Sequence, residues 1–293
     1  DGIQQCKDAN EVLYFYGPAA VLDMALNAED VQIKGAINAG QIPFYDPTLV
    51  PRIKTMIPTL DKVTGGLFEG AVTVFVGSSG SGKSSLADQI AIAALVQNYP
   101  VFIYSGEFGE GRLTSWMNLQ CAGSEYITLK YDPIREEVIP YLPYQVDERI
   151  KKWYDGKLWI YNNEEKSAVT EGDSILLVAT SLIRKYAVKL VIIDNLMTAV
   201  GDREEEFAAQ KEFSNKCKML AKKYGVCVIL VCHARKTAAG APLTKNDVAG
   251  SSAMVNISDV ALSIQPNQIE VIKNRDTGVL KKITFCYAPD SRR

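Results

Sequence analysis

Short apolar runs alternate with longer stretches of mixed composition along most of the chain. The runs have the length and residue types of buried strands, and they predict strands at residues 71–76, 101–104, 158–161, 190–193 and 226–231. The stretches between them predict helices near residues 84–97, 111–121, 173–187 and 205–224. Strands and helices in this order are typical of a parallel sheet with helices on both faces. The pattern therefore predicts an α/β fold with a mostly parallel central sheet.

The pattern changes near the C-terminus. Residues 259–264, 268–273 and 281–287 predict successive strands, and the turn sequences Pro266-Asn267 and Asp276-Thr277-Gly278 separate them. Consecutive strands joined by short turns pair antiparallel, so we expect an antiparallel extension of the sheet.

The N-terminal part differs from the rest. Residues 18–26 predict one short helix, and residues 38–47 have the composition of a loop. We interpret residues 1–55 as a linker that carries one helix, ahead of a single large domain at residues 56–293.

The amino-acid composition and net charge argue against several classes of protein. Hydrophobic residues make up 47% of the 293 residues, the net charge is -2, and the pI is about 5.7. This charge excludes the broad positive field of many duplex-DNA-binding proteins, so any nucleic-acid contact must be local. Six cysteines without a C-x-x-C pair and a single histidine argue against a zinc site or a disulfide framework, and favour a reducing compartment. No apolar run has membrane-spanning length, so we expect no membrane partner.

Residues 77–84 match the phosphate-binding pattern G-x-x-x-x-G-K-[ST] at every fixed position. Glycines let the backbone turn successive N–H groups toward a polyphosphate, and the N-terminus of the following helix adds a favourable dipole. Lys83 is expected to reach the β- and γ-phosphates, and Ser84 to bind Mg²⁺. The alternative is a flexible linker rich in glycine and serine. The predicted nucleotide-binding residues here are Gly77, Ser78, Ser79, Gly80, Ser81, Gly82, Lys83, Ser84 and Ser85.

Two carboxylates follow the ends of predicted strands. Asp194 ends the apolar run Leu190-Val-Ile-Ile-Asp, as expected for a Mg²⁺ partner beside a phosphate loop. Asn195 follows it, so the acid that activates water must come from elsewhere, and Glu107 lies after another strand. Alternatively, Asp194 caps an ordinary buried strand and Glu107 caps the helix that begins near Gly111.

Polar residues near two later strands suggest further roles. His233 follows a strand and can sense the γ-phosphate, or it is an ordinary polar residue with satisfied hydrogen bonds. The loop after it carries Arg235, Lys236 and Lys245, which can bind a nucleic-acid backbone or simply face solvent. Arg275, with Lys273 nearby, precedes a turn; it can reach a neighbouring subunit's γ-phosphate or form a surface ion pair.

These residues together resemble the helicase domain of the RecA-like hexameric replicative helicases, which are related to DnaB. The phage-type primase-helicases and the mitochondrial Twinkle-like proteins are the most similar branch. The resemblance covers about residues 1–290, with motifs at 60–67, 77–84, 106–107, 191–195, 231–236, 248–253, 258–259 and 273–275. Residues 6–10 resemble the end of the primase domain in the same proteins, so we expect the helicase and linker of a longer chain without its primase.

The resemblance implies a RecA-like P-loop NTPase core that uses ATP, or another NTP, with Mg²⁺. Lys83 and Ser84 would bind phosphate and metal, Asp194 would serve the metal, and Glu107 would activate water. His233 would sense the γ-phosphate, and Arg275 would act on the neighbouring subunit with help from Lys273. Tyr287 would stack on the adenine. The linker helix would dock on the adjacent subunit.

The resemblance also implies that single-stranded DNA passes through the centre of a homo-oligomeric ring, which has six subunits by the family pattern. The residues that would face DNA are Arg235, Lys236, Lys245, Asn246, Gly250, Ser251 and Ser252. The sequence around Arg275 departs from the family, because Arg275-Asp-Thr-Gly is more compact than the usual turn.

We therefore expect a helicase domain that couples NTP hydrolysis to translocation and 5′–3′ unwinding, in a phage or bacterial cytoplasm or in a mitochondrial matrix. Two alternatives remain open. A RecA-like recombinase or clock-type ATPase would share the same core without unwinding DNA. A nucleotide-dependent scaffold would bind ATP to assemble partners and hydrolyse it only incidentally.

Overall fold

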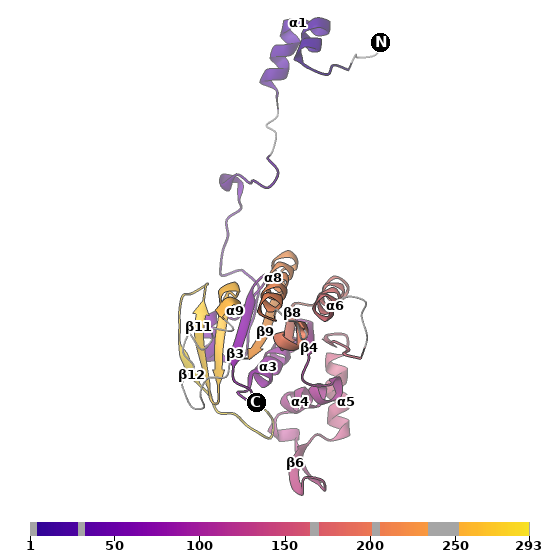
Figure 1. Ribbon diagram of the computed structural model, residues 1–293, viewed down its shortest axis with the longest axis vertical. Coiled ribbons are helices and arrows are strands. Elements are labelled where there is room, and N and C mark those ends of the chain that lie inside the picture. The colour runs from indigo at the N-terminus through magenta and orange to yellow at the C-terminus, as the bar shows by residue number, and fades with distance from the viewer. Residues whose placement is uncertain (1–4, 29–32, 165–169, 201–205, 234–251, 293) are drawn as a thin grey trace. The chain divides into compact units, whose positions relative to one another are not determined.

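A computed structural model describes residues 5–28, 33–164, 170–200, 206–233 and 252–292 (Figure 1). The chain divides into two units, Asp1–Thr48 and Leu49–Arg293. In the described part of the chain, no helix is long and apolar enough to cross a membrane.

The first unit contains the helix α1 (Ala9–Leu26) and the short 3-10 helix η1 (Ala39–Gln41). The carboxylate of Asp8 accepts the backbone N–H groups of Asn10 and Glu11, which starts α1 earlier than the predicted residue 18. Gly17, with a φ of 81°, kinks the helix before Pro18, so the Gly-Pro pair that resembles a helix start lies inside α1.

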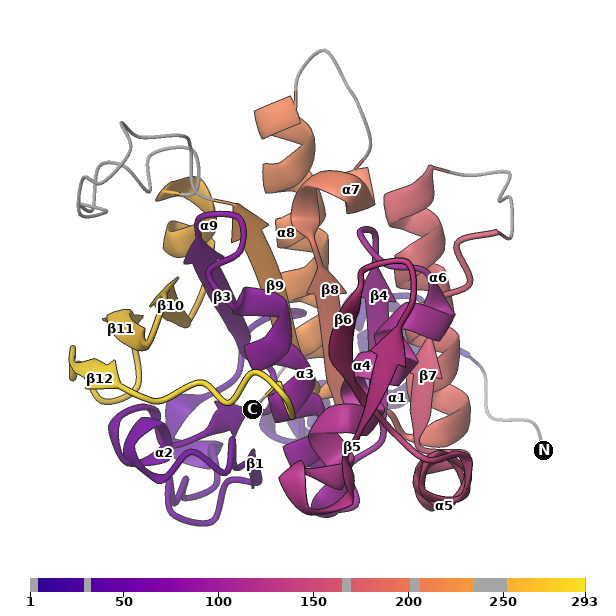
Figure 2. The same cartoon turned by 90° about the horizontal axis from the view of Figure 1, so that it is seen from below.

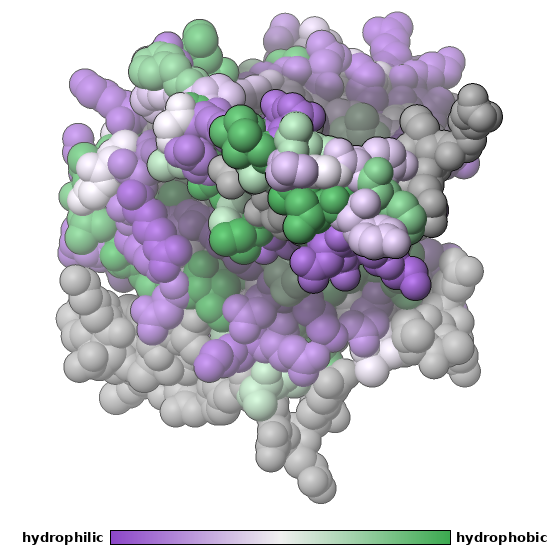
Figure 3. Space-filling view, turned by 90° about the horizontal axis from the view of Figure 1, so that it is seen from above, coloured by the Kyte–Doolittle hydropathy of each residue, from purple (hydrophilic) through white to green (hydrophobic). Residues whose placement is uncertain are grey.

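Most large apolar side chains of α1 are exposed. Figure 3 shows apolar residues in green among hydrophilic ones on the face seen from above. The exposed apolar residues of α1 are Leu13, Tyr14, Phe15, Tyr16, Leu22, Met24 and Leu26.

The second unit is built on an eight-stranded sheet with the order β12-β11-β10-β3-β9-β8-β4-β7. Strands β10, β3, β9, β8, β4 and β7 run parallel, whereas β11 is antiparallel to β10 and to β12. The strands are β3 (Val72–Gly77), β4 (Val101–Ser105), β7 (Leu158–Ile160), β8 (Leu190–Asp194), β9 (Cys227–His233), β10 (Val260–Gln265), β11 (Gln268–Asn274) and β12 (Lys282–Thr284). The mostly parallel sheet and its antiparallel extension are thus as predicted, although β10 itself belongs to the parallel part.

The predicted strand at residues 281–287 is shorter in the structure. β12 ends at Thr284, although the Phe285 N–H still donates to the Asn267 carbonyl oxygen at 3.0 Å. Phe285 and Tyr287 line a cavity beyond the end of β12.

Helices cover both faces of the sheet, because alternate strand residues point to opposite sides. Phe75, Ile103 and Ile192 pack against helices of one face, and Val74, Phe102 and Val191 against those of the other. The first face carries α2 (Pro58–Thr64), α3 (Lys83–Val96) and α4 (Glu110–Ala122). The second carries α6 (Glu171–Tyr186), α7 (Leu196–Val200), α8 (Glu206–Tyr224) and α9 (Ser252–Ile257). Figure 2 shows the two groups on opposite sides.

Several smaller elements are absent from the predicted pattern. Besides η1, α2, α7 and α9, they include the pair β1 (Arg52–Ile53) and β2 (Leu67–Phe68), the 3-10 helix η2 (Ser124–Tyr126), the hairpin β5 (Thr128–Asp132) and β6 (Glu137–Tyr141), and α5 (Tyr144–Tyr154). In the hairpin, the Asp132 carboxylate accepts the N–H groups of Ile134 and Arg135 and so stabilises the turn. This turn contains no glycine, so the usual hairpin signal is missing.

Strand register brings the ends of four parallel strands to one edge of the sheet. Gly77 at the end of β3 pairs with His233 at the end of β9, and Ser105 of β4 pairs with Asp194 of β8. Side chains that follow these strands therefore meet at one edge, where open α/β sheets bind ligands.

The central strand β3 should dominate the stability of the second unit. Phe75 is fully buried at 0% exposure, so we expect Phe75→Ala to lower the free energy of unfolding by about 3–5 kcal/mol. Ile134 is 92% exposed, so Ile134→Ala should change the free energy of unfolding by less than about 0.5 kcal/mol. Urea unfolding of the two variants checks this, and equal effects would contradict the assignment of β3 to the core.

Candidate functional site

A glycine-rich loop joins β3 to α3 at the edge where the strand ends meet. Gly80 and Gly82 have φ values of 74° and 93°, which favour glycine. A Cβ on Gly77 would collide with the carbonyl oxygen of Ile264 and lie 2.6 Å from Ser81 Oγ. These constraints explain the spacing of glycines in the motif, and they let the backbone approach a ligand closely at the N-terminus of α3.

Lys83 begins α3 and is only 4% exposed. Its ammonium group donates a 2.7 Å hydrogen bond to the carbonyl oxygen of Ser78 in the loop. Burial lowers the pKa of Lys83, while the nearby carboxylates of Asp194 and Glu107 raise it. A buried ammonium held by one carbonyl is suited to bind an incoming anion.

Asp194 ends β8 beside the start of α3 and is 6% exposed. Burial raises its pKa, whereas a hydrogen bond from Ser84 and the charge of Lys83 lower it. Ser84 and Asp194 thus present two oxygen ligands of the kind Mg²⁺ prefers. The described residues contain no group of three or more His, Cys, Asp and Glu side chains that could hold a metal alone, so phosphate oxygens and water would complete this coordination.

Glu107, Asn195 and His233 lie within hydrogen-bond distance of one another. Glu107 Oε1 is 2.6 Å from Asn195 Nδ2 and 2.8 Å from His233 Nε2. The two nitrogens are 2.9 Å apart. The residue after β8, the last residue of β9 and a residue of the loop after β4 therefore form one polar cluster at the edge of the sheet.

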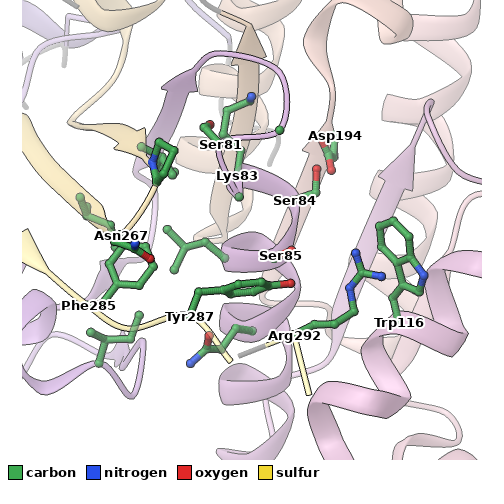
Figure 4. A pocket seen from close by; sticks show the side chains of 18 of the residues that line it. Ser81, Lys83, Ser84, Ser85, Trp116, Asp194, Asn267, Phe285, Tyr287 and Arg292 are labelled. Atoms are coloured by element: carbon green, nitrogen blue, oxygen red, sulfur yellow. The ribbon is translucent and has the colours of Figure 1, made fainter. Parts of the chain in front are cut away.

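A cavity of about 650 Å³ joins the phosphate loop to this cluster. Figure 4 shows Lys83, Ser84 and Asp194 at one end, and Tyr287 and Arg292 farther along the same cavity. The phosphate-loop residues that line it are Ser79, Gly80, Ser81, Gly82, Lys83, Ser84 and Ser85. Among the described residues, the buried Ser81 hydroxyl lacks a hydrogen-bond partner, so a ligand oxygen would satisfy it. The residues present fit a nucleotide with its metal.

The far end of the cavity is apolar and includes residues that the sequence did not indicate. Tyr287, the predicted base-stacking residue, lies here together with Phe285 and Trp116. The Arg292 guanidinium lies 3.2 Å from the centroid of the Trp116 ring, and the Arg292 carbonyl accepts a 2.7 Å hydrogen bond from Gln120. No local sequence signal connects Arg292 to Trp116, because the contact joins the C-terminal segment to α4.

Lys273 and Arg275 lie away from this cavity. Val260 at the start of β10 pairs with Thr73 of β3 and with Asn274 of β11, so these cations lie near the opposite edge of the sheet. The Lys273 ammonium donates to the carbonyl oxygens of Val255, Asn256 and Ser258, and Arg275 donates to Asn256 at 3.0 Å. Within one chain, neither cation meets the phosphate loop.

The predicted DNA-binding loop lies outside the described residues. Its members there are Arg235, Lys236, Lys245, Asn246, Gly250 and Ser251. Ser252 is the first residue of α9.

The chain is similar to a known domain family and to solved ATPase structures. A family model described as an AAA domain matches residues 42–239. The ATPase domain of G40P aligns with a TM-score of 0.64 and 14% identity, over 99% of this chain and 98% of its own. A KaiC-like protein from the hyperthermophilic archaeon Pyrococcus horikoshii gives a TM-score of 0.57 and 19% identity, over 82% of this chain and 97% of its own.

At these identities the structural likeness concerns the fold, which is the RecA-like P-loop ATPase fold in both cases. The predicted fold class and the resemblance to RecA-like helicase ATPase domains are confirmed at that level.

The phosphate loop should tolerate no side chain at its first glycine. We expect Gly77→Ala to weaken nucleotide binding at least about tenfold, because the new Cβ collides with the Ile264 carbonyl and displaces the loop. Gly109 is the matched control, since a Cβ there meets no atom within 4 Å. Titration with a fluorescent ATP analogue measures both variants, and equal affinities would contradict this account of the loop.

Proposed function

Because the chain belongs to the AAA domain family, we propose that it is a Mg²⁺-dependent nucleoside triphosphatase of a DNA helicase. In this proposal, hydrolysis drives translocation on single-stranded DNA and 5′–3′ unwinding of a duplex. The observation that carries the catalytic part is the convergence of Lys83, Asp194, Glu107 and His233 on one cavity. The DNA part rests on the resemblance to replicative helicases and on the fold shared with the ATPase domain of G40P.

Each side chain at the phosphate end of the cavity would have a separate role in hydrolysis. Lys83 would exchange its bond to the Ser78 carbonyl for bonds to the β- and γ-phosphates. Ser84 and Asp194 would hold Mg²⁺, which supplies charge neutralisation at the phosphates when bound. Glu107 would accept the proton of the attacking water, and His233 would donate to the γ-phosphate.

The location of Arg275 supports a site shared between subunits. Arg275 lies near the edge of the sheet opposite its own phosphate loop, so it would serve the loop of a neighbouring chain. A homo-oligomer, in this proposal a ring of six subunits, would then have one composite site at each interface. The segment at residues 235–245, together with Gly250, Ser251 and Ser252, would face DNA in the centre of the ring and add local positive charge.

The likeness to a KaiC-like protein favours a second candidate. In it, the same hydrolytic core acts as a RecA-like recombinase or clock-type ATPase and unwinds no duplex. A third possibility, a nucleotide-dependent scaffold, would need neither Glu107 nor single-stranded DNA for its action.

A fork-unwinding assay with ATP and Mg²⁺ tests the proposal. We expect unwinding of a fork with a 5′ single-stranded tail, together with ATP turnover that single strands stimulate. Glu107→Gln should keep ATP binding but lower turnover by about 10²–10⁴-fold, because the general base is lost. Lys83→Ala is the control that removes phosphate binding itself.

The outcomes separate the candidates. DNA-stimulated turnover without unwinding would favour the recombinase or clock-type candidate. If Glu107→Gln leaves ATP turnover unchanged, Glu107 has no part in the mechanism, and the scaffold is the favoured candidate.

A mixing experiment tests the shared site. Arg275→Ala alone should lower turnover by about 10³-fold, and Lys83→Ala alone should be inactive. Mixed assemblies contain some interfaces with an intact Lys83 from one variant and an intact Arg275 from the other. Turnover should therefore reappear on mixing, measured as phosphate release. If no mixing ratio restores it, Arg275 does not act across an interface.

A further inference from the structure

Asn195 is the least exposed member of the polar cluster at the sheet edge. It is 3% exposed, whereas the side chains of His233 and Glu107 are 28% and 36% exposed. Its position directly after Asp194 and before α7 fixes its backbone between a buried strand and a helix. Asn195 is therefore the best anchored of the three side chains.

The orientation of the Asn195 amide follows from its other hydrogen bonds. Its Oδ1 accepts the backbone N–H of Thr198 at 3.0 Å, as an N-cap residue does, and the Thr198 hydroxyl donates to the Asn195 carbonyl at 3.0 Å. Because Oδ1 must be the acceptor for this N–H, the NH₂ group must face Glu107 and His233. Helix capping and cluster geometry thus require the same orientation of the amide.

The three contacts of the cluster differ in how they depend on protonation. Asn195 Nδ2 is only a donor and an ionised Glu107 is only an acceptor, so their 2.6 Å bond forms in every state of the histidine. His233 Nε2 can donate to Glu107 when it carries hydrogen, or accept from Asn195 when it does not. The Asn195–Glu107 bond is the constant element of the cluster.

The same bond remains when His233 turns to a γ-phosphate. Among the described residues, Asn195 and His233 are the two side chains that hydrogen-bond Glu107. Once His233 donates to a phosphate, Asn195 is the described side chain that still restrains the Glu107 carboxylate. A half-exposed glutamate after a strand would otherwise sample several rotamers, and small misplacements of a base reduce rate strongly.

We propose that Asn195 is a positioning residue that holds the Glu107 carboxylate in place for water activation. The inference rests on the proposed hydrolytic function and adds a residue to its mechanism. Asn195 needs both halves of its amide, because the oxygen caps α7 while the nitrogen restrains the base.

Two substitutions of Asn195 separate the helix-capping role of its amide oxygen from the contact of its amide nitrogen with Glu107. Asn195→Ser keeps a neutral N-cap acceptor but is too short to reach Glu107. We expect it to lower kcat for ATP about 10²-fold, with ATP affinity and the Mg²⁺ requirement changed less than about threefold. Asn195→Asp keeps the size and the cap but replaces the donor by an acceptor, and it should also lower kcat. Thermal unfolding of Asn195→Ser should stay near that of the parent, whereas Asn195→Asp buries a carboxylate beside Asp194 and Glu107 and should unfold at a lower temperature.

A double substitution shows whether the effect passes through Glu107. In the Glu107→Gln background, Asn195→Ser should leave the residual turnover unchanged, because the base it positions is gone. A further loss there of the same size as in the parent background would indicate general damage to the site and overturn the inference.

The two proposals fail in different ways. If the parent hydrolyses ATP, Glu107→Gln lowers turnover and both Asn195 variants keep the parent kcat, the positioning role is wrong and the hydrolytic function stands. If the parent shows no turnover, or Glu107→Gln leaves it unchanged, the proposed function itself fails.

Discussion

The parallel hydrogen-bond ladder through β3, β9, β8 and β4 determines where the polar groups of the site lie. Residues paired across such a ladder stay level with one another, so Gly77 and His233 meet at one edge, as do Ser105 and Asp194. A slip of one residue in any of these strands would turn its buried side chains to the other face and separate the groups. The buried apolar residues on both faces hold the register against such a slip.

Burial at this edge leaves charged groups in an environment that disfavours their charge. Burial lowers the pKa of Lys83 and raises that of Asp194. Burial also raises the pKa of Asp88 in α3 well above its usual range, the nearby Asp194 acts in the same direction, and Arg292 opposes the shift. Lys83 and Asp194 both line the cavity, and groups with shifted pKa values that face a cavity are typical of functional sites. A bound phosphate would give Lys83 the counter-charge that the folded chain supplies only in part.

The sequence predicted the elements whose signals are local. The strands β3, β4, β8 and β9 are continuous apolar runs, and residues 77–84 form a fixed motif, so both could be recognised without knowing any contact. The cavity wall formed by Trp116 and Arg292 could not, because it depends on how the C-terminal segment meets α4. Asn195 was informative in the sequence only because it is not an acid. Its contact with Glu107 joins residues 88 positions apart, and only the fold shows it.

The cavity has walls of unequal stiffness. β3, which carries the phosphate loop, pairs with strands on both sides and is buried throughout, so it cannot shift without breaking two ladders. β12 has three residues and pairs on one side only, and it leads into the segment with Phe285 and Tyr287. The phosphates of a bound nucleotide would therefore lie beside a strand that is paired on both sides. Its other end would lie beside a segment that follows a short edge strand. A larger attached group would displace the edge of the sheet before it displaced the phosphate loop.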